Sequence, residues 1–294
     1  MATTDEIINI YKNDIIISII QNKMATTDEF INIYKNKADE DLQKVTHYGL
    51  DLRFVEEQTP KICLAAVKQN GLALRFVKIE KNSEICLASV NQNGSALCHV
   101  KEQTPEICLA SVKQNGSALY FVKEQTAKLC LAAVQQNGMA LEYVNIEQTP
   151  ELCLAAVNQN GFALRFVKGK KQTPEICVVA LNKVGTALRY VKEQTPELCF
   201  LAVKETGYAL EYVKEQTPEL CWVGIKQNPW ALQFVREQTP ELCLEALKKN
   251  GGVLQFVQEQ TPELCLVAIK DCKLALPFVQ DLKLKEKIKL ELNL

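Results

Sequence analysis

The chain has 294 residues, and its 34 Lys and Arg residues against 35 Asp and Glu residues give a formal net charge of −1 at pH 7. This balance excludes a strong overall attraction to nucleic acid or to an anionic membrane. Hydrophobic residues make up 47% and charged residues 23% of the sequence, as in folded globular proteins, so most of the chain is not disordered. The apolar run at residues 15–20 is too short for a signal peptide or a membrane span. We therefore expect a soluble, cytoplasmic protein with no membrane partner.

The N-terminal part of the sequence contains a duplication. Residues 1–13 and 24–36 differ at one position only, Ile7 against Phe30. We interpret residues 1–37 as an N-terminal segment whose second copy leads into a cap and whose first copy is dispensable. Residues 38–58 are a degenerate half-repeat, because their second half follows the pattern of the repeat that comes next.

One repeat of about 22 residues fills residues 59–280. It is marked by ten regularly spaced cysteines, Cys63, Cys86, Cys108, Cys130, Cys153, Cys177, Cys199, Cys221, Cys243 and Cys265. A unit of this size cannot bury a core alone, so its neighbours must supply the burial, which is typical of a solenoid. The longest insertion, residues 168–171, includes Gly169. We expect a seam or kink at residues 168–172, where trypsin should cut first.

Each repeat is predicted to form two short helices. In one copy, Thr104 is suited to cap the first helix, and Gly116 is expected to end it in the left-handed conformation. A second helix should follow over about residues 118–124. Pro229 and Lys273 replace the glycine in two repeats, and those junctions should differ in geometry. Helical periodicity predicts that the buried positions of this copy are Ile107, Cys108, Ser111, Val112, Ala118, Leu119, Phe121 and Val122.

The fold class predicted from these features is all-α, an α-solenoid of about ten 22-residue helix–turn–helix repeats with terminal caps. The C-terminal segment, residues 281–294, allows two interpretations. Its apolar residues alternate, which is typical of a strand, and a strand would need a partner edge. Leu284, Ile288 and Leu292 are also spaced for one face of a capping helix, rich in strong helix formers. The helical cap is favoured, because the chain before it is helical throughout.

The string LAAVKQNG at residues 64–71, followed by Ala73 and Leu74, resembles the repeats of an uncharacterised domain-of-unknown-function family. That family is abundant in giant DNA viruses of amoebae and also occurs in protists and bacteria. The resemblance covers about residues 59–279 and implies no known activity, substrate or site residue. For a viral member it implies the host cytoplasm or the virion as the compartment.

The cysteine column does not predict a metal or redox site. Neighbouring copies should lie one helix spacing apart, about 8–10 Å, whereas a disulfide needs Cα atoms within about 7 Å. The chain has only 2 His and no C-x-x-C pair, so zinc-ligand spacing is missing. We expect small buried side chains in a reducing compartment, with Cys98 and Cys272 more exposed. No phosphate-binding loop, H-E-x-x-H or G-x-S-x-G motif is present, so we expect no enzyme, catalytic residue, cofactor, metal or small-molecule substrate.

One column of the repeat varies freely, the position after the glycine. It holds Leu72, Ser95, Ser117, Met139, Phe162, Thr186, Tyr208, Trp230, Gly252 and Leu274. Either this is an unconstrained loop position, or it is a contact surface, because large aromatic side chains are costly to leave in water. Phe200 and Trp222 replace the usual Leu of the first helix in the same part of the array. Aromatic clusters on an exposed face are typical of binding hot spots. The candidate partner-binding residues are Met139, Phe162, Phe200, Tyr208, Trp222 and Trp230.

The predicted function is a non-enzymatic scaffold that binds another protein or a peptide along the edge formed by the first helices. One alternative is a nucleic-acid-binding repeat protein, because a column of cations runs along the array: Lys78, Lys101, Lys123, Lys168, Lys192, Lys214 and Arg236, joined by Arg75, Arg165 and Arg189. Glutamates interrupt this column, so a solvated face of mixed charge is the preferred interpretation. A second alternative is a self-assembling structural protein.

Overall fold

The computed structural model describes the backbone of residues 27–292 and the side chains of residues 34–291. Only helices and connecting segments occur over residues 27–292, with no strand, so the predicted all-α repeat fold is confirmed. The first copy of the N-terminal duplication and the run at residues 15–20 lie outside the described residues. The hypothesis that the first copy is dispensable therefore stays a prediction.

The repeats alternate between a ten-residue α-helix and a six-residue 3-10 helix. The α-helices are α3 (Thr27–His47), α4 (Pro60–Gln69), α5 (Ser83–Gln92), α6 (Pro105–Gln114), α7 (Ala127–Gln136), α8 (Pro150–Gln159), α9 (Pro174–Lys183), α10 (Pro196–Glu205), α11 (Pro218–Gln227), α12 (Pro240–Lys249), α13 (Pro262–Asp271) and α14 (Leu282–Leu292). The 3-10 helices are η1 (Gly49–Phe54), η2 (Gly71–Phe76), η3 (Gly94–His99), η4 (Gly116–Phe121), η5 (Gly138–Tyr143), η6 (Gly161–Phe166), η7 (Gly169–Lys171), η8 (Gly185–Tyr190), η9 (Gly207–Tyr212), η10 (Pro229–Phe234), η11 (Gly251–Phe256) and η12 (Lys273–Phe278).

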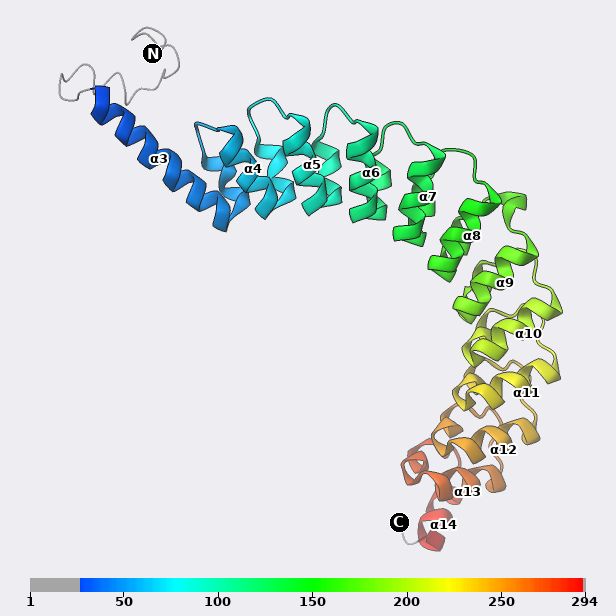
Figure 1. Cartoon of the computed structure of the whole chain (residues 1–294). Coiled ribbons are helices and arrows are strands. Elements are labelled where there is room, and N and C mark those ends of the chain that lie inside the picture. Colours follow the sequence, from blue (N-terminus) through cyan, green and yellow to red (C-terminus); the bar gives the residue numbers. More distant parts are fainter. Residues whose placement is uncertain (1–26, 293–294) are drawn as a thin grey trace. The chain divides into compact units, whose positions relative to one another are not determined.

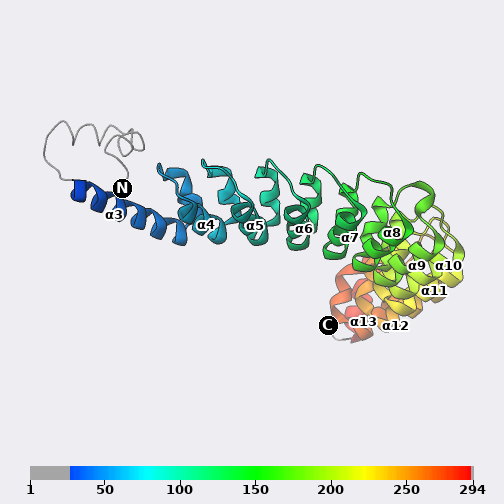
Figure 2. The ribbon, with the colours of Figure 1, turned by 45° about the horizontal axis from the view of Figure 1, so that its top comes forward.

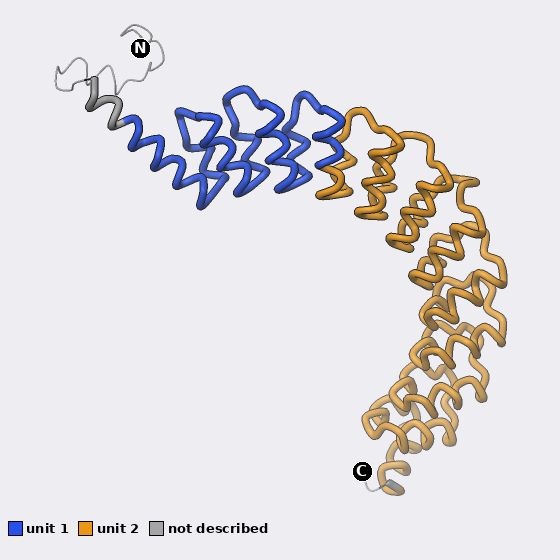
Figure 3. Tube along the Cα trace, viewed as in Figure 1, with its two compact units in different colours: residues 1–110 blue, residues 111–294 orange. Residues whose placement is uncertain are grey.

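The chain divides into two compact units, residues 1–110 and 111–294 (Figure 3). Within each unit, successive repeats lie side by side, each α-helix against the next (Figures 1 and 2). The predicted seam at residues 168–172 lies inside the second unit, where Gly169 has φ +49° and the short helix η7 forms. The expectation that trypsin cuts there first remains a prediction.

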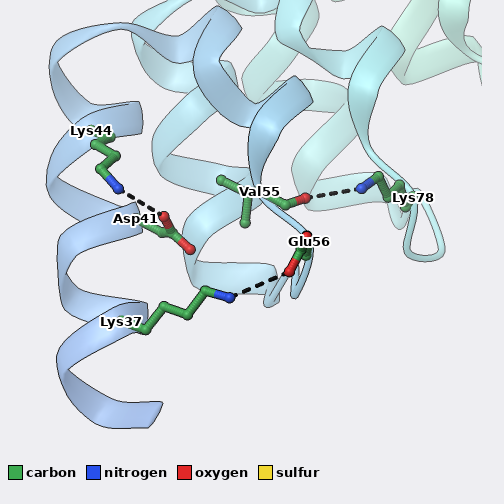
Figure 4. Close-up of polar contacts among 6 residues, drawn as sticks. All are labelled: Lys37, Asp41, Lys44, Val55, Glu56 and Lys78. Carbon is green, nitrogen blue, oxygen red and sulfur yellow. Dashed lines mark hydrogen bonds and ion pairs between the residues drawn. The ribbon is translucent and has the colours of Figure 1, made fainter. Parts of the chain in front are cut away.

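The first unit begins with the long helix α3, which packs against α4 and η1. Val45 of α3 is fully buried, and Lys37 forms an ion pair with Glu56 at 3.4 Å (Figure 4). On the same helix Lys44 pairs with Asp41 at 3.5 Å. The segment before the array thus consists of an α-helix followed by η1, a 3-10 helix of the same length as those of the repeats.

The first helix of each repeat begins and buries its side chains as the sequence predicts. In α10, the hydroxyl of Thr195 accepts a hydrogen bond from the Leu198 amide at 3.4 Å, and Pro196 occupies the first turn. Leu198, Cys199, Ala202 and Val203 form its buried stripe. The same four columns are buried from α4 to α13, and Ala and Leu of the 3-10 helix complete the core in the repeats up to η10, with Val253 and Leu254 in η11. The predicted Phe121 is half-buried rather than buried.

Two details of the predicted repeat are wrong. Among the described glycines only Gly169 has a positive φ, so Gly116 does not end its helix in the left-handed conformation. Instead, a Cβ on Gly116 would overlap the carbonyl oxygen of Ala133 in the next repeat. The residue is glycine because two repeats approach closely there.

The second helix is also shorter and tighter than predicted. It is a 3-10 helix that begins at Gly116 and ends at Phe121, not an α-helix over residues 118–124. The side chain of Asn115 accepts a hydrogen bond from the Ser117 amide at 3.0 Å, which starts the turn at the glycine. The 3-10 helix then runs for six residues, which is longer than is common for this type of helix.

The C-terminal segment forms helix α14, so the strand interpretation is wrong. Asp281 caps this helix by accepting hydrogen bonds from the amides of Lys283 at 2.8 Å and Leu284 at 3.1 Å. Ile288 is 1% exposed, as a capping helix requires, whereas Leu282 and Leu290 are 74% and 80% exposed. Ile288 is thus buried and Leu284 half-buried, while Leu282 and Leu290 remain in water.

Candidate interaction surfaces

A column of glutamines joins successive repeats, each standing directly before a helix cap; Lys81 takes this place before α5. We call the column the glutamine ladder; it includes Gln58, Gln125, Gln148, Gln172, Gln194, Gln216, Gln238 and Gln260. The Nε2 of Gln216 donates to the carbonyl oxygens of Leu210 at 3.0 Å and Phe234 at 2.8 Å. Its Oε1 accepts from the Arg236 amide at 3.0 Å. The other members bond the next repeat in the same two ways. The repeat pattern in the sequence did not predict this role of the glutamines.

The cysteine column lies against the glutamine ladder. The Cys221 thiol is 3.8 Å from Oε1 of Gln216, and corresponding contacts recur in other repeats. Burial raises the pKa of Cys63, Cys130 and Cys243 to about 11, because the thiolate would lose its hydration. All ten column cysteines are buried, while Cys98 is exposed and Cys272 half-buried, as predicted.

Part of the cation column belongs to the packing between repeats. The ammonium of Lys78 donates to the Val55 carbonyl oxygen at 3.0 Å (Figure 4). Lys168 and Lys214 make the same kind of bond to Val144 at 3.4 Å and to Lys192 at 3.0 Å. Arg236 donates to two carbonyl oxygens of the preceding repeat, each at 2.8 Å. These four side chains are accounted for by bonds within the array.

The arginines that accompany the column lie over aromatic rings of the 3-10 helices. The guanidinium of Arg189 is 5.2 Å from the ring centre of Tyr190 and 5.1 Å from that of Tyr212 in the next repeat. Arg165 is 4.8 Å from Phe166, and Arg75 is 4.4 Å from Phe76. Such cation–π contacts contribute about 0.5–1 kcal/mol each at exposed sites.

Four of the six candidate residues share one surface, the 3-10 helices of the second unit. Of Met139, Phe162, Tyr208 and Trp230, three are half-buried and Tyr208 is 39% exposed. Phe162 packs edge-on against Tyr190 with ring centres 6.2 Å apart. The equivalent pairs Tyr208–Phe234 and Trp230–Phe256 lie at 5.9 and 5.8 Å.

The variable column thus packs across the repeat boundary in a row of rings. We call this row the aromatic face; its residues are Phe162, Tyr190, Tyr208, Tyr212, Trp230, Phe234 and Phe256. All of them are half-buried or exposed. Six of the rings contact each other in three pairs across repeat boundaries, and Tyr212 lies beside Arg189 of the preceding repeat. Trp230 leans toward Gly252, the next member of the column, which has no side chain to cover it.

Phe200 and Trp222 lie elsewhere, on α10 and α11. They line grooves between the N-terminal ends of successive α-helices, one of about 690 Å³ beside Phe200 and one of about 190 Å³ beside Trp222. No ring contact of the described side chains joins either residue to the aromatic face. The six candidates therefore divide between two surfaces.

The described part of the chain contains neither a cluster of metal ligands nor a helix that could cross a membrane. Over residues 34–291, no group of three or more His, Cys, Asp or Glu side chains is placed to hold a metal ion. No helix within residues 27–292 combines the length and apolar character that a membrane crossing needs.

Comparison with known proteins finds one related family. Residues 59–104, 82–126, 104–147 and 128–171 match the model of a family described as a domain of unknown function, DUF4116. Residues 59–171 are thus similar to an uncharacterised repeat family, as the LAAVKQNG string indicated. Searches of curated proteins and of solved structures found no significant match.

Proposed function

We propose that the chain is a non-enzymatic scaffold whose second unit binds a segment of another protein on the aromatic face. The observation that supports this proposal is the row of rings itself. Phe162, Tyr208 and Trp230 each pack against the next repeat and keep part of the ring in solvent. Rings held at a fixed angle by a neighbour lose little conformational entropy when a partner covers them, which favours their use as binding anchors.

The nucleic-acid alternative has less support. A protein that binds the phosphate backbone needs free cationic heads, because affinity comes from neutralised phosphates. Lys78, Lys168, Lys214 and Arg236 instead point their charged ends at carbonyl oxygens of the array.

Self-assembly is a second candidate, favoured by one observation at the C-terminal end. Leu274, Leu282 and Leu290 are 81%, 74% and 80% exposed, so the last repeat offers apolar surface that α14 does not cover. Exposed apolar patches of this kind favour association. Light scattering of the full chain at increasing concentration would detect it.

The scaffold proposal is tested by capture from the cell or virus particle in which the chain occurs. Binding partners of the wild-type chain are identified by mass spectrometry and compared with those of Tyr208→Ala and Trp230→Ala. Both variants should keep the fold and lose the partner. Tyr48→Ala, which removes a ring 70% exposed outside the aromatic face, is the matched control and should retain it. Partners captured equally by all variants would contradict the proposal.

A separate variant checks that the aromatic face is not core. Leu232 is fully buried, and Leu232→Ala should cost about 2–5 kcal/mol of stability. If Tyr208→Ala or Trp230→Ala lowers the melting temperature as far as Leu232→Ala does, the column is part of the core and the proposal fails.

A further inference from the structure

The groove beside Phe200 has an apolar base and charged rims. It lies between the N-terminal ends of α10 and α11, with a volume of about 690 Å³. Phe200 is 49% exposed on its wall, although large apolar side chains are normally covered. Cys199 and Leu220, both under 8% exposed, also line it.

The rims of this groove carry an excess of negative charge. Four carboxylates line it, those of Glu193, Glu197, Glu215 and Glu219, against the ammonium groups of Lys192 and Lys214. All four glutamates are exposed. The ammonium of Lys214 donates to the Lys192 carbonyl oxygen at 3.0 Å, which draws it onto the backbone. A ligand therefore meets exposed carboxylates around an exposed ring.

The carboxylate of Glu197, at the start of α10, is ionised at neutral pH, because its pKa is lowered. Hydrogen bonds from the Thr195 hydroxyl and from its own backbone amide lower the pKa of Glu197. The positive end of the helix dipole also favours a carboxylate in the first turn. Negative charge is thus a fixed property of this rim.

The corresponding groove of the first unit has neither an aromatic side chain nor an excess of negative charge. It has a volume of about 310 Å³ and is lined by Lys78, Lys81 and Lys101 against Glu80 and Glu102, with no aromatic residue. The combination of ring and negative rim thus belongs to the second unit and does not follow from the repeat alone.

We propose that the Phe200 groove binds an extended peptide segment of a partner in which an apolar side chain is flanked by lysines or arginines. The apolar side chain packs on Phe200, and the flanking cations pair with the glutamates of the two rims. The Trp222 groove lies one repeat further along and takes the next apolar residue; Glu237 and Arg236 line it, and the Arg236 guanidinium is bonded to two carbonyl oxygens of the array. The inference rests on the proposed scaffold function in that the ligand is a polypeptide, but it uses a different surface from the aromatic face.

The test measures binding of a synthetic peptide to the full-length protein by fluorescence anisotropy. The probe has a central leucine with two lysines on each side; a second probe replaces the lysines by glutamates. The basic probe should bind, and its affinity should fall as salt rises, because the pairs are exposed. The acidic probe should not bind. No binding of the basic probe, or equal binding of both, would overturn the proposal.

Charge-reversal variants locate the site. Glu197→Lys combined with Glu219→Lys should weaken the basic probe by about tenfold or more, since each change replaces an attraction by a repulsion. The fold should tolerate both changes, because Lys61 and Lys128 occupy the same place in other repeats. Glu84→Lys, the same position in the first unit, is the matched control and should leave the affinity unchanged. An unchanged affinity in the double variant would refute the site.

Two further variants separate this proposal from others. Phe200→Leu restores the usual residue of the column and should weaken the probe several-fold without loss of fold. Tyr208→Ala should leave probe binding unchanged, so failure of the groove and failure of the aromatic face are distinguishable. If the wild-type chain self-associates and the glutamate variants abolish it, the occupant is a second copy, and the proposal of a separate partner is wrong.

Discussion

Removal of a glutamine from the glutamine ladder should weaken the array more than its position in a polar loop suggests. Gln216→Ala deletes three hydrogen bonds to backbone groups, at 2.8, 3.0 and 3.0 Å, and two of them belong to the next repeat. At about 1 kcal/mol net for each bond, the free energy of unfolding should fall by about 3 kcal/mol. The side chain is half-buried, so water compensates only in part.

A second substitution at Gln216 should cause a smaller loss of stability, because another repeat of the chain already has the substituted residue at this position. Lys81 occupies the ladder position in one repeat, and its ammonium donates to the His99 carbonyl oxygen at 3.5 Å. Gln216→Lys should therefore keep a donor for Phe234 but lose the acceptor for the Arg236 amide. Its loss of stability should lie between those of wild type and Gln216→Ala.

The measurement combines urea unfolding with hydrogen exchange, because repeat arrays open locally and need not unfold as one unit. In Gln216→Ala the Arg236 amide and its neighbours should exchange faster, while amides near Gln58 should not change. Urea curves within about 0.5 kcal/mol of wild type, below the value of one net hydrogen bond, would show that the ladder does not hold the repeats together.

The buried thiols should make the array sensitive to alkali. Folding raises the pKa of Cys63, Cys130 and Cys243 from 9.0 to about 11, so their stabilisation is complete below pH 9 and is lost as pH rises toward 11; pH-dependent melting checks this, and a flat profile would contradict it. Thiol labelling at pH 8 should modify exposed Cys98 first and the column last. Limited trypsin digestion should cut first at residues 168–171, where exposed lysines flank Gly169; earlier cleavage elsewhere in the array would refute this. Deletion of residues 281–294 should lower stability, since Ile288 is buried, without changing the mass in solution; a fall from dimer to monomer would point to an intermolecular role.

The parts of the fold that the sequence could predict depend on local chemistry. A Thr-Pro pair starts eight of the ten repeat helices, and the cap bond is local, because the Thr195 hydroxyl and the Leu198 amide are only three residues apart. The buried columns follow from helical periodicity within ten residues. The period of the cysteines then places these columns along the array.

The parts that could not be predicted depend on contacts between repeats. The partners of Gln216 beyond its own repeat lie 18 and 20 residues away, and nothing in the sequence around Gln216 identifies them. The reason for Gly116 is likewise a carbonyl group in the next repeat. The division of the candidate residues has the same origin: Tyr208 and Phe200 are close in sequence but lie on different helices, and only the stacking shows that they serve different surfaces.

Because these contacts join two repeats, a change of residue in one repeat can be matched by a change in the next. Pro229 illustrates this. Where a glycine starts the 3-10 helix, its amide usually donates to a side chain that ends the next α-helix, as Gly207 does to Gln227 at 2.7 Å. Pro229 has no amide hydrogen, and the residue opposite it is Lys249, which has no acceptor and donates instead to the Lys226 carbonyl oxygen at 2.7 Å.

The geometry of the Pro229 junction was expected to differ, and that expectation is wrong. Asn228 has φ −151° and ψ 115°, against −147° and 112° for Asn160 before a glycine. At this junction donor and acceptor are absent together, so the proline leaves neither group unsatisfied. The coupling is not absolute, since Lys183 stands opposite Gly161. A repeat of this type therefore keeps its backbone geometry when residues at a junction are exchanged. The same holds for the Phe200 groove, because α10 carries Phe200 and still buries the usual stripe of Leu198, Cys199, Ala202 and Val203.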